Sequence, residues 1–251
     1  MSACFQFVLG FVLISSAAWA EEPATKGSGN MKAALRKLKL PGIELNLEEQ
    51  SVDVEATVCL HEGSLELIAC AEGTKEHESI LALSARPMHI HTAMLLMGAK
   101  PGNPAMKKVS DGEGVRWVPV DPSGDQVWLS LVLTDPEGKQ VEQPISQFVS
   151  PVGSGVKGEG ISGKGMEKFP DHFLFAGSHL VQGGPGPKKY VCEQSGNVIS
   201  ISTFGDEFLC LPGIHGHNNK GLVWQVNPEG LPGIGEKVTL RLRRKPKFAK
   251  P

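Results

Sequence analysis

Ser51-Val-Asp-Val-Glu-Ala-Thr-Val-Cys-Leu60 is the stretch that decides the fold, because apolar and polar residues alternate along it. Side chains of a β-strand point alternately to its two faces, so this period of two predicts a half-buried strand. One face carries Val52, Val54, Ala56, Val58 and Leu60, and the other carries Asp53, Glu55, Thr57 and Cys59. The remaining elements are predicted around this strand.

The segments on either side continue the β pattern. His61-Glu-Gly63 predicts a tight turn, so residues 65–70 are expected to return as the second strand of a hairpin, with residues 79–85 as a further strand. Residues 127–134 alternate again, and Asp135-Pro-Glu-Gly138 predicts a second hairpin with residues 139–142. Later strands are expected over residues 173–176, 189–192, 197–202, 207–211, 222–225 and 238–242.

Helices are predicted to be few and short. Residues 31–40 place apolar side chains at helical spacing among basic ones, and Pro41-Gly42 ends the pattern. A second helix is expected to begin near Pro87, because Ile90, Ala93, Met94 and Met97 recur at intervals of three and four before Gly98. With 30 Gly and 18 Pro, the predicted class is mainly β or α+β: one β-rich domain of about ten short strands and one or two short helices.

The first twenty residues have the features of a secretory signal peptide. They contain no charged side chain, an apolar run over residues 5–14, and Ala18-Trp-Ala20 directly before Glu21. Cleavage after Ala20 would export the protein to the periplasm or the exterior, although the uncharged start leaves an uncleaved anchor open. No later stretch is long and apolar enough to be expected to cross a membrane.

These patterns divide the chain into a signal peptide (1–20), a flexible leader with a short basic helix (21–40), a domain (41–243) and a basic tail (244–251). The tail could bind an acidic envelope polymer or be a solvated terminus. A formal net charge of −2 gives no general attraction to nucleic acid. No nucleic-acid partner is therefore expected, while an envelope polymer or a protein stays open.

Several blocks resemble the YdjY-domain family of exported bacterial proteins. They are Val58-Cys-Leu-His-Glu-Gly, Gly73-Thr-Lys-Glu-His-Glu-Ser, Met97-Gly-Ala-Lys-Pro-Gly, Phe175-Ala-Gly-Ser and Gly196-Asn-Val-Ile-Ser. The blocks span most of residues 41–243, and the resemblance implies one exported domain. It supplies no activity and no catalytic residues.

The cysteines exclude one cofactor and leave two redox states open. An iron–sulfur cluster needs closely spaced cysteines, whereas Cys59, Cys70, Cys192 and Cys210 stand singly. In the predicted hairpin the first two lie four positions apart, about 13 Å at the rise of a strand, which is too far for a disulfide. A three-strand meander would hold the other two about 9.5 Å apart. Buried free thiols are favoured, with local disulfides left open if the first loop is wider.

Two clusters could carry chemistry. Lys75, Glu76, His77 and Glu78 lie on a connection between strands, where binding residues are often found, but they could also form a salt-bridged turn. His89 and His91, with His77 upstream, are candidate ligands for zinc or another metal. On the predicted helix His89 and His91 diverge by about 200°, which opposes joint ligation.

No catalytic motif is complete, since the chain has no GxSxG, HExxH or CxxC sequence. We therefore favour an exported, non-enzymatic binding or accessory domain. The alternative is a metal-dependent exported enzyme that uses His77, His89 and His91. The sequence leaves the choice between them, and the ligand, open.

Overall fold

The computed structural model describes residues 40–111, 114–152, 168–216 and 223–246, which belong to one compact unit, residues 38–251. The predicted signal peptide, the leader, the basic helix up to residue 39 and the last five residues lie outside the described residues. The predicted class is confirmed: the described chain is β-rich, with two α-helices.

The elements follow in this order: β1 Ile43–Asn46, β2 Ser51–Val58, β3 Leu67–Ala71, η1 Glu76–Glu78, β4 Ser79–Leu83, α2 Pro87–Leu96, β5 Pro101–Asn103, β6 Met106–Asp111, β7 Gly114–Pro119, β8 Ser123–Gly124, β9 Gln126–Thr134, β10 Gln140–Pro144, η2 Ile145–Phe148, β11 Val149–Pro151, β12 Phe173–Leu174, β13 Leu180–Val181, β14 Lys189–Tyr190, α3 Val191–Ser195, β15 Asn197–Ser200, β16 Leu209–Cys210, β17 Trp224–Val226 and β18 Lys237–Arg243. Within the described ranges, neither helix has the length and apolar character needed to span a bilayer.

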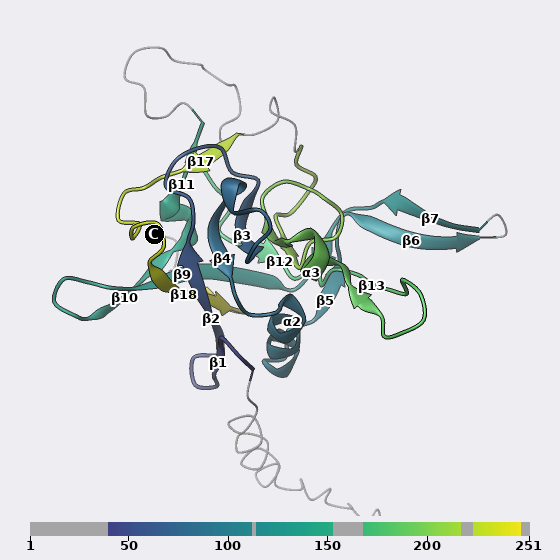
Figure 1. Ribbon diagram of the computed structural model, residues 1–251, viewed down its shortest axis with the longest axis horizontal. Helices are drawn as coiled ribbons and strands as arrows, with labels where there is room; N and C mark the ends of the chain where they lie inside the picture. The colour runs from purple at the N-terminus through teal and green to yellow at the C-terminus, as the bar shows by residue number, and fades with distance from the viewer. Residues whose placement is uncertain (1–39, 112–113, 153–167, 217–222, 247–251) are drawn as a thin grey trace, which may run out of the picture. The chain divides into compact units, whose positions relative to one another are not determined.

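Eight of these strands close into a barrel. The hydrogen-bonded order β2-β18-β9-β12-β16-β15-β3-β4 returns to its start because β4 also pairs with β2. β3–β4 and β15–β16 are parallel pairs and the others are antiparallel. β1 adds to β2 and β10 adds to β9, so the main sheet has ten strands (Figure 1). Closure removes the free edges that an open sheet would expose.

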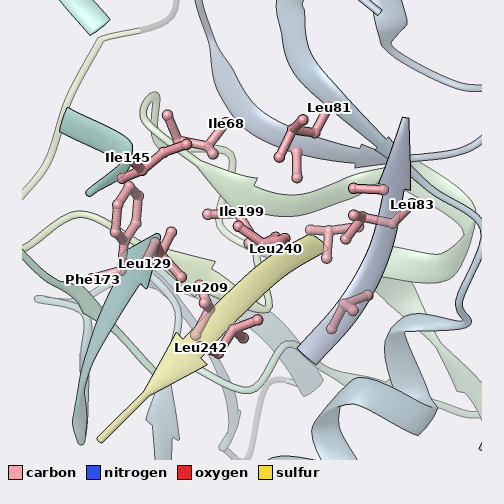
Figure 2. Close-up of a cluster of buried hydrophobic side chains, with 14 of the residues drawn as sticks. Ile68, Leu81, Leu83, Leu129, Ile145, Phe173, Ile199, Leu209, Leu240 and Leu242 are labelled. Carbon is pink, nitrogen blue, oxygen red and sulfur yellow. The ribbon is translucent and has the colours of Figure 1, made fainter. Parts of the chain in front are cut away.

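The barrel core follows from the period-two pattern. Val54 pairs with Leu240, which pairs with Leu131, and all three side chains have no exposed area. Figure 2 shows side chains from several strands converging on this core, among them Leu240, Leu81 and Ile199. Burying each such side chain contributes roughly 1.5–3 kcal/mol. The predicted strand at residues 51–60, the second hairpin and the strand at 238–242 are confirmed.

α2 confirms the predicted second helix. Pro87 stands in its first turn, Ile90, Ala93 and Met94 are buried in the barrel core, and Gly98 follows with a left-handed φ of 80°. The helix contacts β1, β2 and α3. It therefore packs against β1 and β2 of the main sheet and against α3.

Two topological predictions, the first hairpin and the three-strand meander, and one strand boundary are wrong. β2 and β3 do not form a hairpin, because β4 lies between them and pairs with both. The predicted strand at residues 189–192 is strand only at Lys189–Tyr190, after which α3 begins, so Cys192 is helical. The expected three-strand meander is absent from the described residues, since β15 and β16 pair in parallel. The β6–β7 hairpin was not predicted.

Gly196 lies against Thr74, so it brings two of the sequence blocks quoted above into contact. It ends α3 with a φ of 81°, and a Cβ atom there would lie 2.3 Å from Thr74 Oγ1. The Thr74 hydroxyl in turn donates a hydrogen bond to the Ala71 carbonyl at 2.5 Å. Only glycine lets the connection between β3 and β4 approach the end of α3 so closely.

We predict that Gly196→Ala lowers the free energy of unfolding by about 2–4 kcal/mol, because it combines an unfavourable φ with a steric clash. Gly138→Ala is the matched control: Gly138 has the same φ of 81°, and a Cβ atom added there would meet no other atom within 4 Å. The control should cost only about 1 kcal/mol. Urea unfolding of both variants measures the difference, and equal losses would show that the Thr74 contact is unimportant.

Candidate functional site

The first candidate site is a pair of thiols beside the connection between β3 and β4. Cys59 follows β2 directly, and its backbone N–H donates to the Ile80 carbonyl of β4 at 2.9 Å. Cys70 lies in β3 and pairs with Ala82 of β4. With Leu67 and Phe204 they form a small apolar cluster separate from the barrel core. All four cysteines in the described ranges are free thiols.

Because β4 lies between β2 and β3, Cys59 and Cys70 flank one strand instead of lying on a hairpin, and both contribute to the same small cluster. The Cys59 thiol donates to the Ser79 carbonyl at 3.1 Å, and the Cys59 side chain packs against the cluster that contains Cys70. Cys70 has no exposed area, whereas Cys59 is partly exposed. The predicted hairpin was wrong, but two strand spacings of about 9.5 Å still exceed the reach of a disulfide, and both thiols are free as expected.

The interaction with Cys59 lowers the pKa of Cys70 to about 6, helped by the Ser79 hydroxyl and the Lys75 backbone N–H and opposed by burial. The interaction with Cys70, together with burial, raises the pKa of Cys59. The two cysteines are thus coupled, with their pKa values shifted in opposite directions. Burial instead raises the pKa of Cys192 to about 12.

The predicted binding residues form the turn that covers this pair. Lys75 Nζ lies 3.0 Å from Glu78 Oε1 and 3.9 Å from the centre of the Phe204 ring. Glu76 accepts the backbone N–H of Gly73. The side chain of His77 is 78% exposed and lies 3.8 Å from Glu78. These interactions make a salt-bridged turn.

The histidines proposed as metal ligands lie in different surroundings. No group of three or more His, Cys, Asp and Glu side chains with metal-binding spacing occurs among the residues that the structure describes. His89 and His91 both lie on α2, as predicted, and His77 lies on η1. His89 Nδ1 is buried without a hydrogen-bond partner in the described part of the chain.

His91 is part of an aromatic cluster. Its Nδ1 is 2.8 Å from the Tyr190 hydroxyl, which donates to the Gly177 carbonyl at 2.7 Å. The hydroxyl hydrogen is thereby used, so Nδ1 of His91 carries a proton and donates it to Tyr190. The ring meets Phe175 edge-on, with centroids 4.9 Å apart. Burial lowers the pKa of His91, against a smaller opposing effect of Gly177.

The second candidate site is a cavity of about 450 Å³ on the polar face of β9 and β18. Trp128 and Arg243 are paired across these strands and both line it. The ring of His172 lies 5.8 Å from that of Trp128, and His172 Nδ1 donates to Asp171 at 2.9 Å. The other lining residues are Gln126, Leu129, Ser130, Glu142, Pro144, Ile145, Ser146, Pro170 and Pro246.

An ion network forms one side of this cavity. Glu142, whose side chain is 5% exposed, accepts hydrogen bonds from Arg243 Nε at 3.0 Å, Arg241 at 3.1 Å and the Ser130 hydroxyl at 2.8 Å. Arg241 also binds both carboxylate oxygens of Asp53, at 2.7 and 2.5 Å. Both arginines are thus held by carboxylates, which fixes the cavity wall.

Sequence reasoning did not find this cavity. One signal was present: Trp128 stands at a position of β9 where the alternation places side chains on the polar face. A large aromatic side chain there is unusual for a solvated strand face and is typical of a binding surface. Its partners His172 and Arg243 come from distant parts of the chain, which no local pattern brings together.

Comparison with known families identifies the first part of the described chain. Residues 43–152 match the family model of the YdjY domain. The chain carries a YdjY domain. No curated protein and no solved structure matches the chain.

The YdjY match contains β1 to β11, the thiol pair and the turn above it. Four strands that close the barrel, β12, β15, β16 and β18, come after the matched residues. The Trp128 cavity is likewise lined by residues inside and beyond the matched segment, because His172 and Arg243 lie beyond residue 152. In this chain the matched YdjY residues therefore build their barrel together with the segment that follows.

We predict that His91→Gln weakens the dependence of stability on pH. The pKa of His91 is lowered in the folded state, so its contribution is complete above about pH 6.5 and is lost as the pH falls. Glutamine can donate to Tyr190 but does not titrate. Losing the aromatic contacts of His91 should lower the free energy of unfolding by roughly 1 kcal/mol at pH 7.5. The further loss of stability on acidification should be smaller than in the wild type.

Thermal unfolding at pH 7.5 and pH 5.0 measures this effect. His77→Gln is the control, because the His77 side chain is 78% exposed, and it should keep the wild-type difference between the two pH values. A His91→Gln variant with an unchanged pH dependence would contradict the assignment.

Proposed function

We propose that this protein is an exported, non-enzymatic binding domain that holds a neutral saccharide in the Trp128 cavity. The observation that carries the proposal is the pairing of an indole wall with fixed polar groups in a cavity of about 450 Å³. Cavities of this size suit small organic ligands, and a few polar groups in an otherwise apolar lining set the ligand's orientation.

The chemistry of the lining favours a sugar ring. A sugar ring has an apolar C–H face that can pack on the indole of Trp128, and a rim of hydroxyl groups that donate and accept hydrogen bonds. Gln126 is exposed, and the carboxylate of Asp171 has 42% of its side chain accessible. Both can face the hydroxyl rim.

Charge argues against an acidic ligand. The lining carries Glu142 and Asp171 against a single guanidinium, Arg243, which Glu142 already holds. An anionic polymer would find little net attraction there. The basic residues near the C-terminus do not alter this balance, since Arg244 Nη1 donates to the Met97 carbonyl at 3.0 Å and the group lies 3.7 Å from Asp125.

The export part of the proposal depends on the sequence of residues 1–20. A neutral saccharide of an envelope polymer would be met outside the cytoplasm, which agrees with a signal peptide cleaved after Ala20. The free thiols do not conflict with export, because Cys70, Cys192 and Cys210 are buried from an external oxidant.

We predict that Trp128→Ala strongly weakens saccharide binding. Screening the wild-type protein on an array of neutral glycans, followed by calorimetry with each bound glycan, supplies the ligand and its affinity. Loss of the indole should weaken binding at least tenfold, about 1.4 kcal/mol. Trp117→Ala is the matched control, because Trp117 is 41% exposed on β7 and does not line the cavity.

Two results would contradict the saccharide proposal. One is a wild-type protein that binds no neutral glycan on the array. The other is equal weakening by Trp117→Ala and Trp128→Ala, which would place the ligand elsewhere or show a general loss of folding. Circular dichroism of both variants separates these last two cases.

We also predict that the protein purified from its native host begins at Glu21. The residues around Ala20 fit signal peptidase, and no charged side chain precedes them. N-terminal sequencing after cell fractionation tests this prediction. A chain that begins at Met1 in the membrane fraction would show a retained anchor instead.

A further inference from the structure

A cavity of about 460 Å³, separate from the Trp128 cavity, lies where the loop between β13 and β14 faces the start of α2. This loop, the Gly-Pro loop, has the sequence Gly-Gly-Pro-Gly-Pro-Lys over residues 183–188. Arg86 and Met88 line the cavity from the start of α2, and Glu193 lines it from α3. None of these residues lines the Trp128 cavity.

The lining of this cavity carries an excess of positive charge. Three cationic side chains, Arg86, Lys188 and Lys189, stand against the carboxylate of Glu193. That carboxylate is already occupied, because it accepts hydrogen bonds from Arg86 Nη2 at 3.1 Å and from the Met88 backbone N–H at 3.3 Å. Neither lysine forms an ion pair within the described ranges. The charges of the two lysines are therefore uncompensated.

The Gly-Pro loop is held in one conformation despite its glycines. The side-chain amide of Gln182 donates to the Gly186 carbonyl at 2.9 Å and also to the Gly184 carbonyl. Gly184 and Gly186 have φ angles of 136° and 132°, in the region that favours glycine. Pro185 and Pro187 fix their own φ angles. The lysines at the end of the loop are therefore presented from a preorganised segment.

The loop also offers backbone donors. Gly184 and Gly186 line the cavity, and their N–H groups donate to no acceptor in the described part of the chain. Successive free N–H groups in a glycine-rich turn are suited to binding an anion. The first turn of α2 does not contribute in this way, since Glu193 already accepts the Met88 N–H. The capacity to bind an anion thus comes from the loop and its lysines.

We propose that this cavity binds a phosphate group, either as the free ion or as part of a small phosphate ester. A phosphate ester carries about two negative charges and several acceptor oxygens, which match the uncompensated Lys188 and Lys189. Arg86 uses one nitrogen on Glu193 and has others to donate. A cavity of this volume has room for an organic part, which would lie against Met88 and the prolines.

This proposal does not depend on the saccharide proposal. The two cavities share no lining residue, and their charge balances are opposite. Glu142 and Asp171 outweigh Arg243 in the Trp128 cavity, whereas cations outweigh the carboxylate beside the Gly-Pro loop. Either site can therefore fail its test while the other passes.

The test is calorimetric titration of the purified protein at low ionic strength with glycerol 3-phosphate, inorganic phosphate and glycerol. We expect both phosphate-bearing probes to bind, more weakly as salt is added, and glycerol not to bind. Equal affinity for the two phosphate probes would identify a site for the phosphate group alone. Tighter binding of the ester would show that the apolar lining contacts its carbon chain.

A pair of lysine variants locates the site. Lys188→Gln combined with Lys189→Gln should weaken phosphate binding about tenfold or more, because it removes both uncompensated charges. The matched control combines Lys107→Gln with Lys108→Gln. These two adjacent lysines are exposed on β6, and neither lines the cavity. The control removes the same charge and should leave phosphate binding unchanged.

Glu193→Gln should have an effect of the opposite sign. It removes the carboxylate from the cavity lining and releases Arg86, while the amide oxygen can still accept the Met88 N–H. We expect phosphate binding to become tighter by about threefold or more. Because this variant gains affinity, a general loss of folding cannot produce the expected result.

Three results would overturn the proposal. The first is a wild-type protein that binds neither glycerol 3-phosphate nor inorganic phosphate. The second is equal weakening by the two double-lysine variants, which would show a general attraction to exposed lysines. The third is a Glu193→Gln variant that is folded by circular dichroism and binds phosphate no more tightly than the wild type.

Discussion

The pairing of β4 with both β2 and β3 is the constraint on which the rest of the structure depends. It closes the barrel, because β4 is antiparallel to β2 and parallel to β3. A two-residue hairpin turn cannot join a parallel pair, and here residues 72–78, which include η1, return the chain to the start of β4. The same pairing brings Cys59 and Cys70 together from the two sides of one strand. The fold, the turn and the thiol pair thus have one cause.

On β9, β10 and β18, a charged strand face forms one wall of the Trp128 cavity. Arg241 and Arg243 alternate with core leucines along β18, and their guanidinium groups converge on Glu142 of β10. Such partly buried charges are tolerated only when they are paired. The paired charges leave a fixed, nearly neutral wall beside Trp128. This wall supports the proposal of a neutral ligand with one apolar face.

The sequence predicted the elements with strong periodicity better than their arrangement. β2, β9, β18 and α2 were all found, because alternation and helical spacing are local consequences of burying one face. The hairpin between β2 and β3 was wrong because a tight turn at Gly63 is only a local preference. β6 and β7 were missed because Lys107, Lys108 and Arg116 weaken their apolar alternation. The turn at residues 73–79 was expected to be either a binding loop or a salt-bridged turn, and the Lys75–Glu78 ion pair shows that it is salt-bridged, while a binding role stays a prediction.

The sequence by itself determined the β-rich class, the inward face of each main strand and the YdjY resemblance that the family match confirms. Only the tertiary structure decided which strands are neighbours, since pairing partners far apart in the chain are chosen by the closure of a common core. That choice placed Cys59 and Cys70 in one small cluster. It also placed His172 and Arg243 beside Trp128. Both candidate sites depend on contacts between distant segments, which periodicity along a single chain does not encode.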